Sequence, residues 1–261
     1  MIEVIVAGAA GRMGREVVKA VTAATGMRVA AAVDPGAAGV EVDDGAGGTI
    51  TVTGDLSTVL AGTGPRVLVD FTVPGAVESN VEKALAAGVH CVVGTTGVST
   101  DRWAAMAERA KDGACLFVAP NFAVGAVLMM KFAAQAARYM PNVEIIELHH
   151  DRKLDAPSGT ALRTAKLIAD ARREVPASPG AETEVAPGAR GALVDGVSVH
   201  SVRLPGLVAH QEVLFGGPGQ TLTIRHDSID RSSFMPGVVL AVSKVIDRRG
   251  LVVGLEELMD E

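Results

Sequence analysis

The stretch that decides the fold is residues 1–35, MIEVIVAGAAGRMGREVVKAVTAATGMRVAAAVDP. It begins with a run of β-branched and small apolar residues at Ile2–Ala7 and ends with a similar run at Arg28–Val33. Between them, after a turn rich in glycine, the apolar residues of Arg12–Ala24 recur at the spacing of an amphipathic helix. Continuously apolar strands that alternate with helices predict a parallel β-sheet covered by helices on both faces.

The same alternation continues to about residue 122, so the first half of the chain is predicted to form one α/β domain. Residues 36–54 interrupt it, because they contain six glycines and only a brief strand signal at Thr49–Thr53. We interpret them mainly as a loop. Further strands are predicted at Arg66–Phe71, His90–Val93 and Cys115–Ala119, and further helices at Ala76–Ala87 and Asp101–Lys111.

Beyond residue 122 the order of elements changes, because three strand-like runs follow one another without helices between them. Such runs predict a mixed or antiparallel sheet, and therefore a second, smaller α/β domain. We expect the first domain to span 1–123 and to be completed by 233–261, with 124–232 as the second domain. Helices are expected at about Val124–Tyr139, Ser158–Arg173 and Ser232–Arg248, strands at Val143–Leu148, Val197–Leu204, His210–Phe215 and Gln220–His226, and a connection rich in proline and glycine at Pro176–Gly191.

The composition excludes several classes of protein. The chain has 261 residues, of which 48% are hydrophobic, so it can bury a large core rather than remain disordered. Its net charge of −6 argues against nucleic-acid binding, which needs a basic surface to neutralise phosphates. No apolar run approaches the roughly 20 residues that span a bilayer. Since the N-terminus also has no basic leader before its first strand, we expect a cytoplasmic protein with no membrane partner.

The two cysteines, Cys91 and Cys115, both fall in apolar runs that are predicted as strands. We interpret them as two small buried hydrophobic residues, which is typical of cysteines in a reducing compartment. A structural disulfide between them is the alternative.

The turn between the first strand and the first helix reads GAAGRMG over residues 8–14. Glycines there let the backbone approach a pyrophosphate without Cβ atoms in the way, and the helix N-terminus offers amide groups to the anion. Asp34 ends the second strand 20 residues beyond Gly14, where a carboxylate can accept hydrogen bonds from an adenosine ribose. The motif predicts a dinucleotide site, and a tight turn with a surface aspartate is the alternative.

The residue after Asp34 bears on the choice of dinucleotide. Pro35 occupies the usual position of a basic side chain that would bind the 2′-phosphate of NADPH. This favours NADH, or the use of both dinucleotides, over a strict preference for NADPH. Arg12 and Arg15 remain as other sources of positive charge.

Three more loops follow the carboxyl ends of predicted strands, the edge at which ligands bind in open α/β sheets. FTVP at 71–74 and GTTG at 94–97 carry small hydroxyl side chains that can lie along a nicotinamide and its ribose. APNF at 119–122 closes the last strand of the first domain. Taken singly, each loop is also explained as a simple turn.

The densest cluster of chemical groups is ELHHDRKLDAPSGTA at 147–161, where two adjacent histidines end a predicted strand. Ser158 is a suitable N-cap for the following helix, and the first-turn amides of Gly159 and Thr160 form a site for a carboxylate or phosphate. Lys153 adds a positive charge and a source of protons. The cluster predicts a small polyanionic substrate that must be protonated during reaction.

Other interpretations of the polar residues are set aside on physical grounds. Adjacent histidines on an extended chain point to opposite faces, and no cysteine or third histidine lies close by in sequence, so we expect no metal site. A helix cap fully explains Ser158, so we do not expect it to be a nucleophile. Structural roles are expected for His90, His200, His210, His226, Arg225, Asp227 and Arg231.

With these motifs together, the sequence resembles the 4-hydroxy-tetrahydrodipicolinate reductase (dihydrodipicolinate reductase) family. The string His-His-x-x-Lys-x-Asp-x-Pro-Ser-Gly-Thr is highly specific, whereas the glycine turn is not. The resemblance covers nearly the whole chain. It rests on GAAGRMG at 8–14, DFTVP at 70–74, GTTG at 94–97, APNFAVG at 119–125, ELHHDRKLDAPSGTA at 147–161, GLVAHQEVLFG at 206–216 and RHDSIDRSSFMPG at 225–237.

The resemblance implies a Rossmann-type domain that binds NADH or NADPH, and a smaller mixed α/β domain that binds substrate and builds a homotetramer. It implies the reduction of (2S,4S)-4-hydroxy-2,3,4,5-tetrahydrodipicolinate, a small dicarboxylate, to tetrahydrodipicolinate with loss of water, on the diaminopimelate route to lysine.

The resemblance also implies roles for residues. His149 would be the acid/base and Lys153 the proton donor, while His150, Gly159 and Thr160 would hold a substrate carboxylate. The cofactor would be bound by Gly8, Ala9, Ala10, Gly11, Arg12, Met13, Asp34, Gly94, Thr95, Thr96, Ala119, Pro120, Asn121 and Phe122.

The sequence departs from the family at one place. Many relatives have an acidic residue followed by arginine at the end of the second strand, where this chain has Asp34-Pro35, so the cofactor preference does not follow from the family. Two alternatives stay open: another two-domain dehydrogenase that acts on a small carboxylate, and a protein that binds NADH as a sensor without catalysis.

Overall fold

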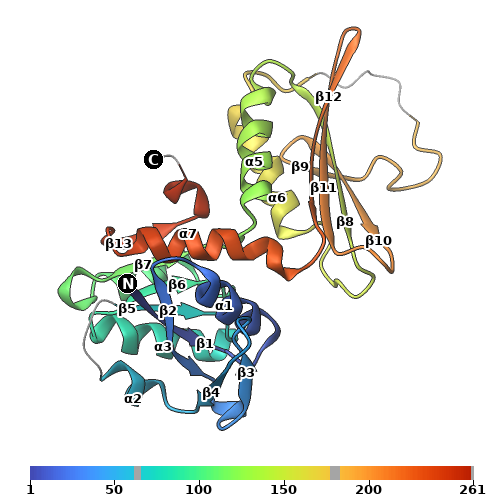
Figure 1. Cartoon of the computed structure of the whole chain (residues 1–261). Coiled ribbons are helices and arrows are strands. Elements are labelled where there is room, and N and C mark those ends of the chain that lie inside the picture. The colour runs from blue at the N-terminus through green and yellow to red at the C-terminus, as the bar shows by residue number, and fades with distance from the viewer. Residues whose placement is uncertain (62–65, 177–182, 260–261) are drawn as a thin grey trace. The chain divides into compact units, whose positions relative to one another are not determined.

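The chain forms two compact units (Figure 1). The structure is a computed structural model that describes residues 1–61, 66–176 and 183–259. Unit 1 comprises Met1–Val124 and Arg231–Glu261, and unit 2 comprises Gly125–Asp230. The chain passes from one unit to the other at two places, each within two residues of the boundary expected from the sequence.

Unit 1 alternates strands and helices, as the sequence predicts. Its strands are β1 (Ile2–Ala7), β2 (Met27–Val33), β3 (Glu41–Asp43), β4 (Thr49–Thr53), β5 (Arg66–Asp70), β6 (His90–Val93), β7 (Cys115–Val118) and β13 (Gly250–Val253). Its helices are α1 (Arg12–Ala23), α2 (Leu56–Leu60), α3 (Pro74–Ala86), α4 (Thr100–Ala107) and α7 (Met235–Val245).

The sheet of unit 1 has the order β13-β7-β6-β5-β1-β2-β4-β3. Among its described strands, every pairing is parallel except that of β3 with β4. Leaving out β3 and β13, the parallel strands β1, β2, β4, β5, β6 and β7 are the first to sixth along the chain. They lie side by side in the order 3-2-1-4-5-6, which is that of the Rossmann fold. The predicted Rossmann-type parallel sheet is confirmed.

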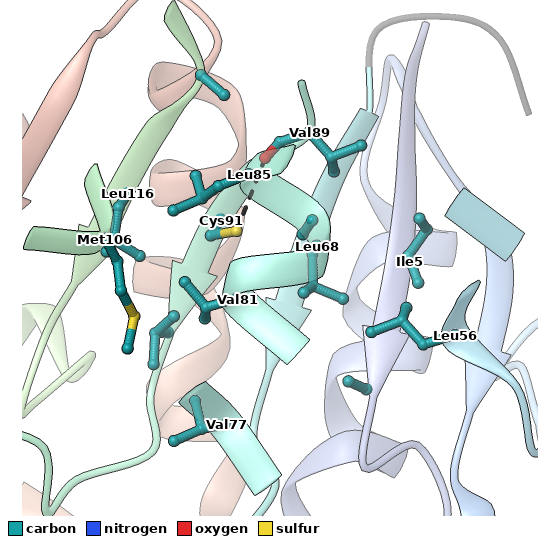
Figure 2. Close-up of a cluster of buried hydrophobic side chains, with 14 of the residues drawn as sticks. Ile5, Leu56, Leu68, Val77, Val81, Leu85, Val89, Cys91, Met106 and Leu116 are labelled. Carbon is teal, nitrogen blue, oxygen red and sulfur yellow. Dashed lines mark hydrogen bonds between the residues drawn. The ribbon is translucent and has the colours of Figure 1, made fainter. Parts of the chain in front are cut away.

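The core of unit 1 lies on both faces of its central strands. Helices α2, α3 and α4 pack over one face, where they bury Ile5, Leu68 and Leu116 (Figure 2). Helices α1 and α7 contact each other, and α7 also packs on β5, β6 and β7. Each fully buried aliphatic side chain contributes roughly 1.5–3 kcal/mol, so the continuous apolar strands hold the carboxyl edge of the sheet rigidly in place.

The interpretation of residues 36–54 as mainly loop is wrong in part: the strand signal at Thr49–Thr53 is confirmed as β4, but β3 at Glu41–Asp43 was not predicted. The segment contains the antiparallel hairpin β3–β4, whose second strand pairs with β2. Its turn is closed by Oδ1 of Asp44, which accepts a hydrogen bond from the amide of Gly48 at 2.9 Å. The glycines that suggested a loop are turn residues, since Gly45 and Gly47 have φ values of 79° and 93°. Helix α2 and strand β13 are likewise not predicted, and α4 ends at Ala107 rather than at Lys111.

Unit 2 is a smaller, mixed α/β structure, as predicted. Its helices are α5 (Val124–Ala137) and α6 (Gly159–Ala171), and its strands are β8 (Asn142–His149), β9 (Ala192–Val194), β10 (Val197–Arg203), β11 (Ala209–Gly217) and β12 (Gln220–Ser228). The strand order is β12-β11-β8-β10-β9, with β10 parallel to β8 and the other pairings antiparallel. Strand β9 is not predicted, and residues 177–182 of the expected connection lie outside the described residues.

Both cysteines are buried free thiols, so the interpretation as small buried residues is confirmed and a disulfide between them is wrong. Cys91 lies in the apolar cluster beneath α3. Burial raises the pKa of Cys115 to about 11, so this thiol stays protonated and unreactive at neutral pH.

Candidate functional site

The turn after β1 is built for close approach of backbone. Gly8 has a φ of 75°, and a Cβ atom there would lie 2.9 Å from the carbonyl oxygen of Phe71. A Cβ atom at Gly14 would lie 2.1 Å from the carbonyl oxygen of Gly8 and 2.7 Å from Cα of Ala9. Gly11 caps α1 without a side-chain hydrogen bond, so the amides of the first turn face this loop. The geometry suits an anion at the N-terminus of α1.

A buried carboxylate organises the neighbouring loops. Oδ1 of Asp70, at the end of β5, accepts hydrogen bonds from the amide and hydroxyl of Thr72 at 2.9 and 2.6 Å and from the hydroxyl of Thr95 at 3.1 Å. Its Oδ2 accepts one from Nδ2 of Asn80 at 2.8 Å. One side chain thus joins the loops after β5 and β6 to α3. Asp70 was not predicted as a site residue, although a single carboxylate at the end of the apolar strand RVLVD is a usable signal.

Aromatic packing supports the same edge of the sheet. The ring of Phe122 lies 5.5 Å from that of Phe71 and 5.9 Å from that of Phe117. Gly94 makes room for this cluster, because a Cβ atom there would lie 2.1 Å from the ring of Phe71. Since Phe122 is only 2% exposed, its side chain belongs to the core, and its backbone is what it can offer to a cofactor.

The structure brings all the predicted cofactor residues to the carboxyl edge of the unit 1 sheet, after β1, β2, β6 and β7. The side chain of Asp34 accepts a hydrogen bond from the amide of Gly36 at 3.2 Å, and residues 35–39 carry no charge. Buried residues in this set are Ala9, Thr95, Ala119 and Phe122, partly buried ones are Gly8, Ala10, Met13, Asp34, Gly94 and Asn121, and exposed ones are Gly11, Arg12, Thr96 and Pro120.

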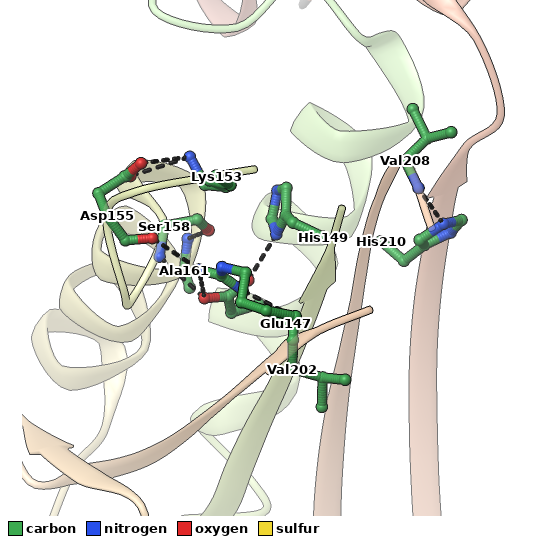
Figure 3. A network of polar contacts seen from close by, with 10 residues as sticks. Glu147, His149, Lys153, Asp155, Ser158, Ala161, Val202, Val208 and His210 are labelled. Atoms are coloured by element: carbon green, nitrogen blue, oxygen red, sulfur yellow. Dashed lines mark hydrogen bonds and ion pairs between the residues drawn. The ribbon is translucent and has the colours of Figure 1, made fainter. Parts of the chain in front are cut away.

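In unit 2 the candidate site is centred on Glu147, a residue of β8 with 0% exposure (Figure 3). Arg203 donates to both of its oxygens, at 2.7 Å to Oε1 and 2.8 Å to Oε2. The amide of Ser158 donates to Oε1 at 3.1 Å, and Nδ1 of His149 lies 2.5 Å from Oε2. Arg203 also donates to the carbonyl oxygen of Asp155 at 2.7 Å. Glu147 and Arg203 were not predicted as site residues.

The electrostatics of this cluster set the charges of its members. Burial alone would raise the pKa of Glu147, but hydrogen bonds from Arg203, Ser201 and His149 outweigh it and hold the pKa below its ordinary value. For His149 burial dominates and lowers the pKa, against the opposing effect of Glu147. At neutral pH the pair therefore consists of a carboxylate and a neutral imidazole.

The lowered pKa of Glu147 predicts how stability depends on pH. A carboxylate whose pKa is lower in the folded than in the unfolded chain stabilises the fold at pH values above its pKa in the unfolded chain, 4.5. This stabilisation is lost as the pH falls through the pKa of the folded chain. We expect the free energy of unfolding to fall more steeply below pH 4.5 in the native chain than in the Glu147→Gln variant. Urea unfolding of the native chain and of the variant, at neutral and at acid pH, measures these free energies. An equal fall in the two chains would contradict the prediction.

Lys153 lies in the turn after β8, and its side chain is 22% exposed. Its Nζ donates to both carboxylate oxygens of Asp155, at 2.8 and 2.9 Å, and this hydrogen bond lowers the pKa of Asp155. The amide of Lys153 donates to the carbonyl oxygen of His150 at 3.2 Å. Nδ1 of His150 is buried and has no hydrogen-bond partner within the described residues.

The N-terminus of α6 faces the same turn. Oγ of Ser158 accepts a hydrogen bond from the amide of Ala161 at 3.2 Å, which confirms it as the N-cap. A Cβ atom at Gly159 would meet nothing within 4 Å, so open space lies beside the first amide of the helix. The carbonyl oxygen of Thr160 accepts a hydrogen bond from the hydroxyl of Thr164 at 2.7 Å, and Gln211 donates to that hydroxyl at 2.8 Å.

The five predicted catalytic and substrate residues therefore lie along one β8–α6 connection, residues 149–160. Polar residues outside this connection contact one another: His200 pairs with Glu144, and Asp227 pairs with His210 and Arg225. A cavity of about 940 Å³ in unit 2 is lined by Glu144 and His200 and by none of the five.

Residues 1–61, 66–176 and 183–259 hold no group of three or more His, Cys, Asp or Glu side chains that could bind a metal ion. They also hold no helix whose length and apolar character would carry it across a bilayer.

Comparison with known proteins identifies the family. Residues 2–122 match the family model described as dihydrodipicolinate reductase, N-terminus, and residues 125–259 match the model described as dihydrodipicolinate reductase, C-terminus. The chain belongs to the dihydrodipicolinate reductase family. The resemblance inferred from the motifs is confirmed.

Individual members of the dihydrodipicolinate reductase family match over their whole length. A 4-hydroxy-tetrahydrodipicolinate reductase of Mycolicibacterium smegmatis is 52% identical over 257 residues, and one of Syntrophomonas wolfei is 51% identical over 260 residues, each match covering 98% of both chains. The structure of a dihydrodipicolinate reductase from Paenisporosarcina sp. TG-14 with dipicolinate bound has a TM-score of 0.85 at 44% identity, covering 99% of this chain and 100% of that one. The chain is an oxidoreductase of a family that uses NAD(P)H.

Proposed function

We propose that the chain catalyses the NAD(P)H-dependent reduction of (2S,4S)-4-hydroxy-2,3,4,5-tetrahydrodipicolinate to tetrahydrodipicolinate, with loss of water, in lysine biosynthesis through diaminopimelate. The observation that carries the proposal is the β8–α6 connection, where a lysine ammonium, two histidines and a helix N-terminus lie within residues 149–160. The sequence identity of 52% and 51% to two enzymes of this name, over 98% of each chain, supports the proposal.

Unit 1 holds the dinucleotide in this proposal. The amides at the N-terminus of α1 bind the pyrophosphate, where Cβ atoms at Gly8 and Gly14 would close the turn. Asp34 accepts hydrogen bonds from the adenosine ribose. The substrate first loses its 4-hydroxyl and a proton of the adjacent ring carbon as water, which gives a conjugated C=C–C=N system. When bound, the reduced nicotinamide would supply a hydride to that system.

Unit 2 holds the dicarboxylate and moves the proton. The amides of Gly159 and Thr160 and the ring of His150 bind a substrate carboxylate. Hydride transfer leaves negative charge on the neighbouring substrate atom, and the ammonium of Lys153 donates a proton to it. His149 acts as the acid/base beside Lys153. That the Paenisporosarcina relative was solved with dipicolinate bound supports a dicarboxylate site.

The proposal is tested by following NADH absorbance with freshly made substrate. Oxidation of NADH in proportion to substrate supports it. Binding of NADH without its oxidation would favour a sensor, whereas oxidation with another small carboxylate but not with this substrate would favour a different dehydrogenase. Calorimetric titration with dipicolinate gives an independent measure of the dicarboxylate site.

The uncharged turn after Asp34 predicts the cofactor preference. Residues 35–39 offer no cation to a 2′-phosphate, so we expect NADH to be used at least as well as NADPH. Pro35→Arg is expected to raise the ratio of kcat/KM for NADPH to that for NADH about tenfold, because a charge-assisted hydrogen bond contributes roughly 1.5–3 kcal/mol. Pro35→Ala is the matched control, since it removes the ring without adding charge. An equal rise in the control would contradict the explanation.

The oligomeric state is part of the proposal, and we expect a homotetramer built through unit 2. Helix α6 packs on one face of its sheet, whereas Glu144, His200 and Leu214 of the other face line a cavity of about 940 Å³. Leu193 and Leu222 are 76% and 40% exposed, and exposed apolar groups of this kind are typical of subunit interfaces. Light scattering after size-exclusion chromatography measures the mass, and a monomer at micromolar concentration would contradict the tetramer.

A cytoplasmic location is also proposed. Two buried free thiols fit a reducing compartment, and the reaction needs a supply of reduced dinucleotide. Cell fractionation with an antibody to the chain tests this, and recovery outside the cytoplasm would contradict it.

A further inference from the structure

Glu147 does more than fill a buried position under the candidate site. We propose that it is a positioning residue: its carboxylate keeps the ring proton of His149 on Nδ1 and at the same time holds the turn that leads into α6. Nε2 is then the nitrogen through which His149 exchanges protons. The inference rests on the proposed function, because it concerns the acid/base of that reaction.

The donors around the carboxylate decide where the proton lies. Oε1 of Glu147 faces Arg203 and the amide of Ser158, Oε2 faces Arg203 and His149, and the side chain of Ser201 also hydrogen-bonds to the carboxylate. A guanidinium and a backbone amide can only donate, so both oxygens act as acceptors. A carboxylate paired with arginine carries no hydrogen of its own. The hydrogen between Oε2 and Nδ1 therefore belongs to the ring of His149.

The other ring nitrogen is left for chemistry. No hydrogen bond reaches Nε2 of His149 from the residues that the structure describes. Because burial keeps the imidazole neutral, Nε2 carries a lone pair that can accept a proton and return it. A neutral histidine protonated on Nε2 would present a donor in the same place and could not act as a base.

A second histidine in unit 2 shows the contrast. Nδ1 of His210 lies 2.6 Å from Oδ1 of Asp227, the same link between a ring and a carboxylate (Figure 3 labels this ring). The amide of Val208 donates to its Nε2 at 3.1 Å, however, so both ring nitrogens are engaged. His210 is therefore held by its neighbours, whereas His149 is held on one side only.

The same carboxylate also fixes the start of α6. Its Oε1 receives the amide of Ser158, the residue that caps the helix, and Arg203 extends the contact to the carbonyl oxygen of Asp155. Asp155 in turn holds the ammonium of Lys153. The predicted acid/base, proton donor and anion-binding helix end are thus tied to one buried group.

Glutamine at this position is expected to invert the tautomer. The side-chain NH2 of the glutamine, if it took the place of Oε1, would face two obligatory donors, Arg203 and the backbone amide of Ser158. In the place of Oε2 it would face Arg203 and His149, and the histidine can become an acceptor by moving its proton to Nε2. In the second arrangement the NH2 group faces only one obligatory donor, Arg203, because His149 accepts its hydrogen bond. The Glu147→Gln variant should therefore carry the proton of His149 on Nε2.

The tautomer is measured directly by NMR of the full chain labelled with ¹⁵N-histidine, with the His149 signals assigned through the His149→Gln variant. We expect a protonated Nδ1 and an unprotonated Nε2 in the native chain, the reverse in Glu147→Gln, and the native pattern in Glu147→Asp. A native chain with its His149 proton on Nε2 overturns the inference, whether or not the chain reduces the proposed substrate. This spectrum needs no variant at position 147, so it decides the question even where Glu147→Gln does not fold.

Kinetics separate positioning from general stability. Glu147→Gln is expected to lower kcat about 10–100-fold, as is typical of groups that orient a functional histidine, while the Kd for NADH stays unchanged. Glu147→Asp should recover most of kcat because it restores the charge. Asp227→Asn is the matched control, since it breaks a carboxylate–histidine–arginine cluster in which Asp227 hydrogen-bonds to His210 and Arg225, neither of them a predicted site residue. Unaltered kcat in a folded Glu147→Gln variant overturns the inference, as does an equal loss in Asp227→Asn. An inactive native chain with the expected tautomer would instead refute the proposed function.

Discussion

Replacing Lys153 by alanine is expected to lower kcat about 10²–10⁴-fold with the fold intact, because general-acid catalysis contributes a factor of this size. The ammonium is held at 2.8 and 2.9 Å by Asp155 in a turn that leads to the N-terminus of α6. Its side chain is 22% exposed and hydrogen-bonds only to Asp155 among the described residues. Stopped-flow measurement of NADH oxidation gives kcat, and circular dichroism checks the fold.

The control for this change is Lys166→Ala. Lys166 lies on α6 and pairs with Asp170, so the variant removes another lysine–aspartate pair from the same unit. Its side chain is 69% exposed, and kcat is expected to stay at the native value. A Lys153→Ala variant with a near-native rate would refute the role of Lys153 as proton donor. Equal losses in both variants would point to a general effect of charge.

Gly14→Ala is expected to weaken NADH binding roughly 10–100-fold. The new Cβ atom would lie 2.1 Å from the carbonyl oxygen of Gly8 and 2.7 Å from Cα of Ala9, so the turn after β1 must move. Holding the turn in its native form around NADH would cost about 1–3 kcal/mol, the usual cost of overpacking, and each 1.4 kcal/mol is about tenfold in Kd. The displaced amides at the N-terminus of α1 would no longer meet the pyrophosphate. Fluorescence titration with NADH measures Kd directly.

The matched control is Gly75→Ala, which makes the same chemical change in the first turn of α3. A Cβ atom at Gly75 would meet nothing within 4 Å, and NADH binding should be unchanged. The Kd for dipicolinate is expected to be native in both variants, because its predicted contacts lie in unit 2. Native NADH affinity in Gly14→Ala would contradict the assignment of the turn to the pyrophosphate.

Much of the fold could be predicted because long elements carry strong local patterns. The run from β1 through α1 to β2 is recognised by apolar strands on either side of a glycine turn, and its structure agrees at nearly every boundary. The elements that were missed are short: β3, β9, β13 and α2. Such elements are stabilised by pairing at a sheet edge or by packing, and a few residues do not establish a period.

The candidate site in unit 2 was predictable because its chemical groups are neighbours in sequence. His149, Lys153 and Gly159 lie on one connection, so a single motif names them. The residues that position them are distant along the chain. Arg203 is 56 residues from Glu147, and Gln211 is 47 residues from Thr164, so neither contact is written in a local pattern.

By itself the sequence determined the two α/β units, the strand ends that carry the glycine turn, and the residues that can bind anions or donate protons. These follow from periodicity, glycine placement and side-chain chemistry, all of which are local. Only the tertiary structure decided that Asp70 joins three segments of unit 1 and that Glu147 meets Arg203, Ser158 and His149 in unit 2. The reason is that strand register brings distant residues together, as when β10 places Arg203 beside His149 of β8, and this register depends on the packing of the whole sheet.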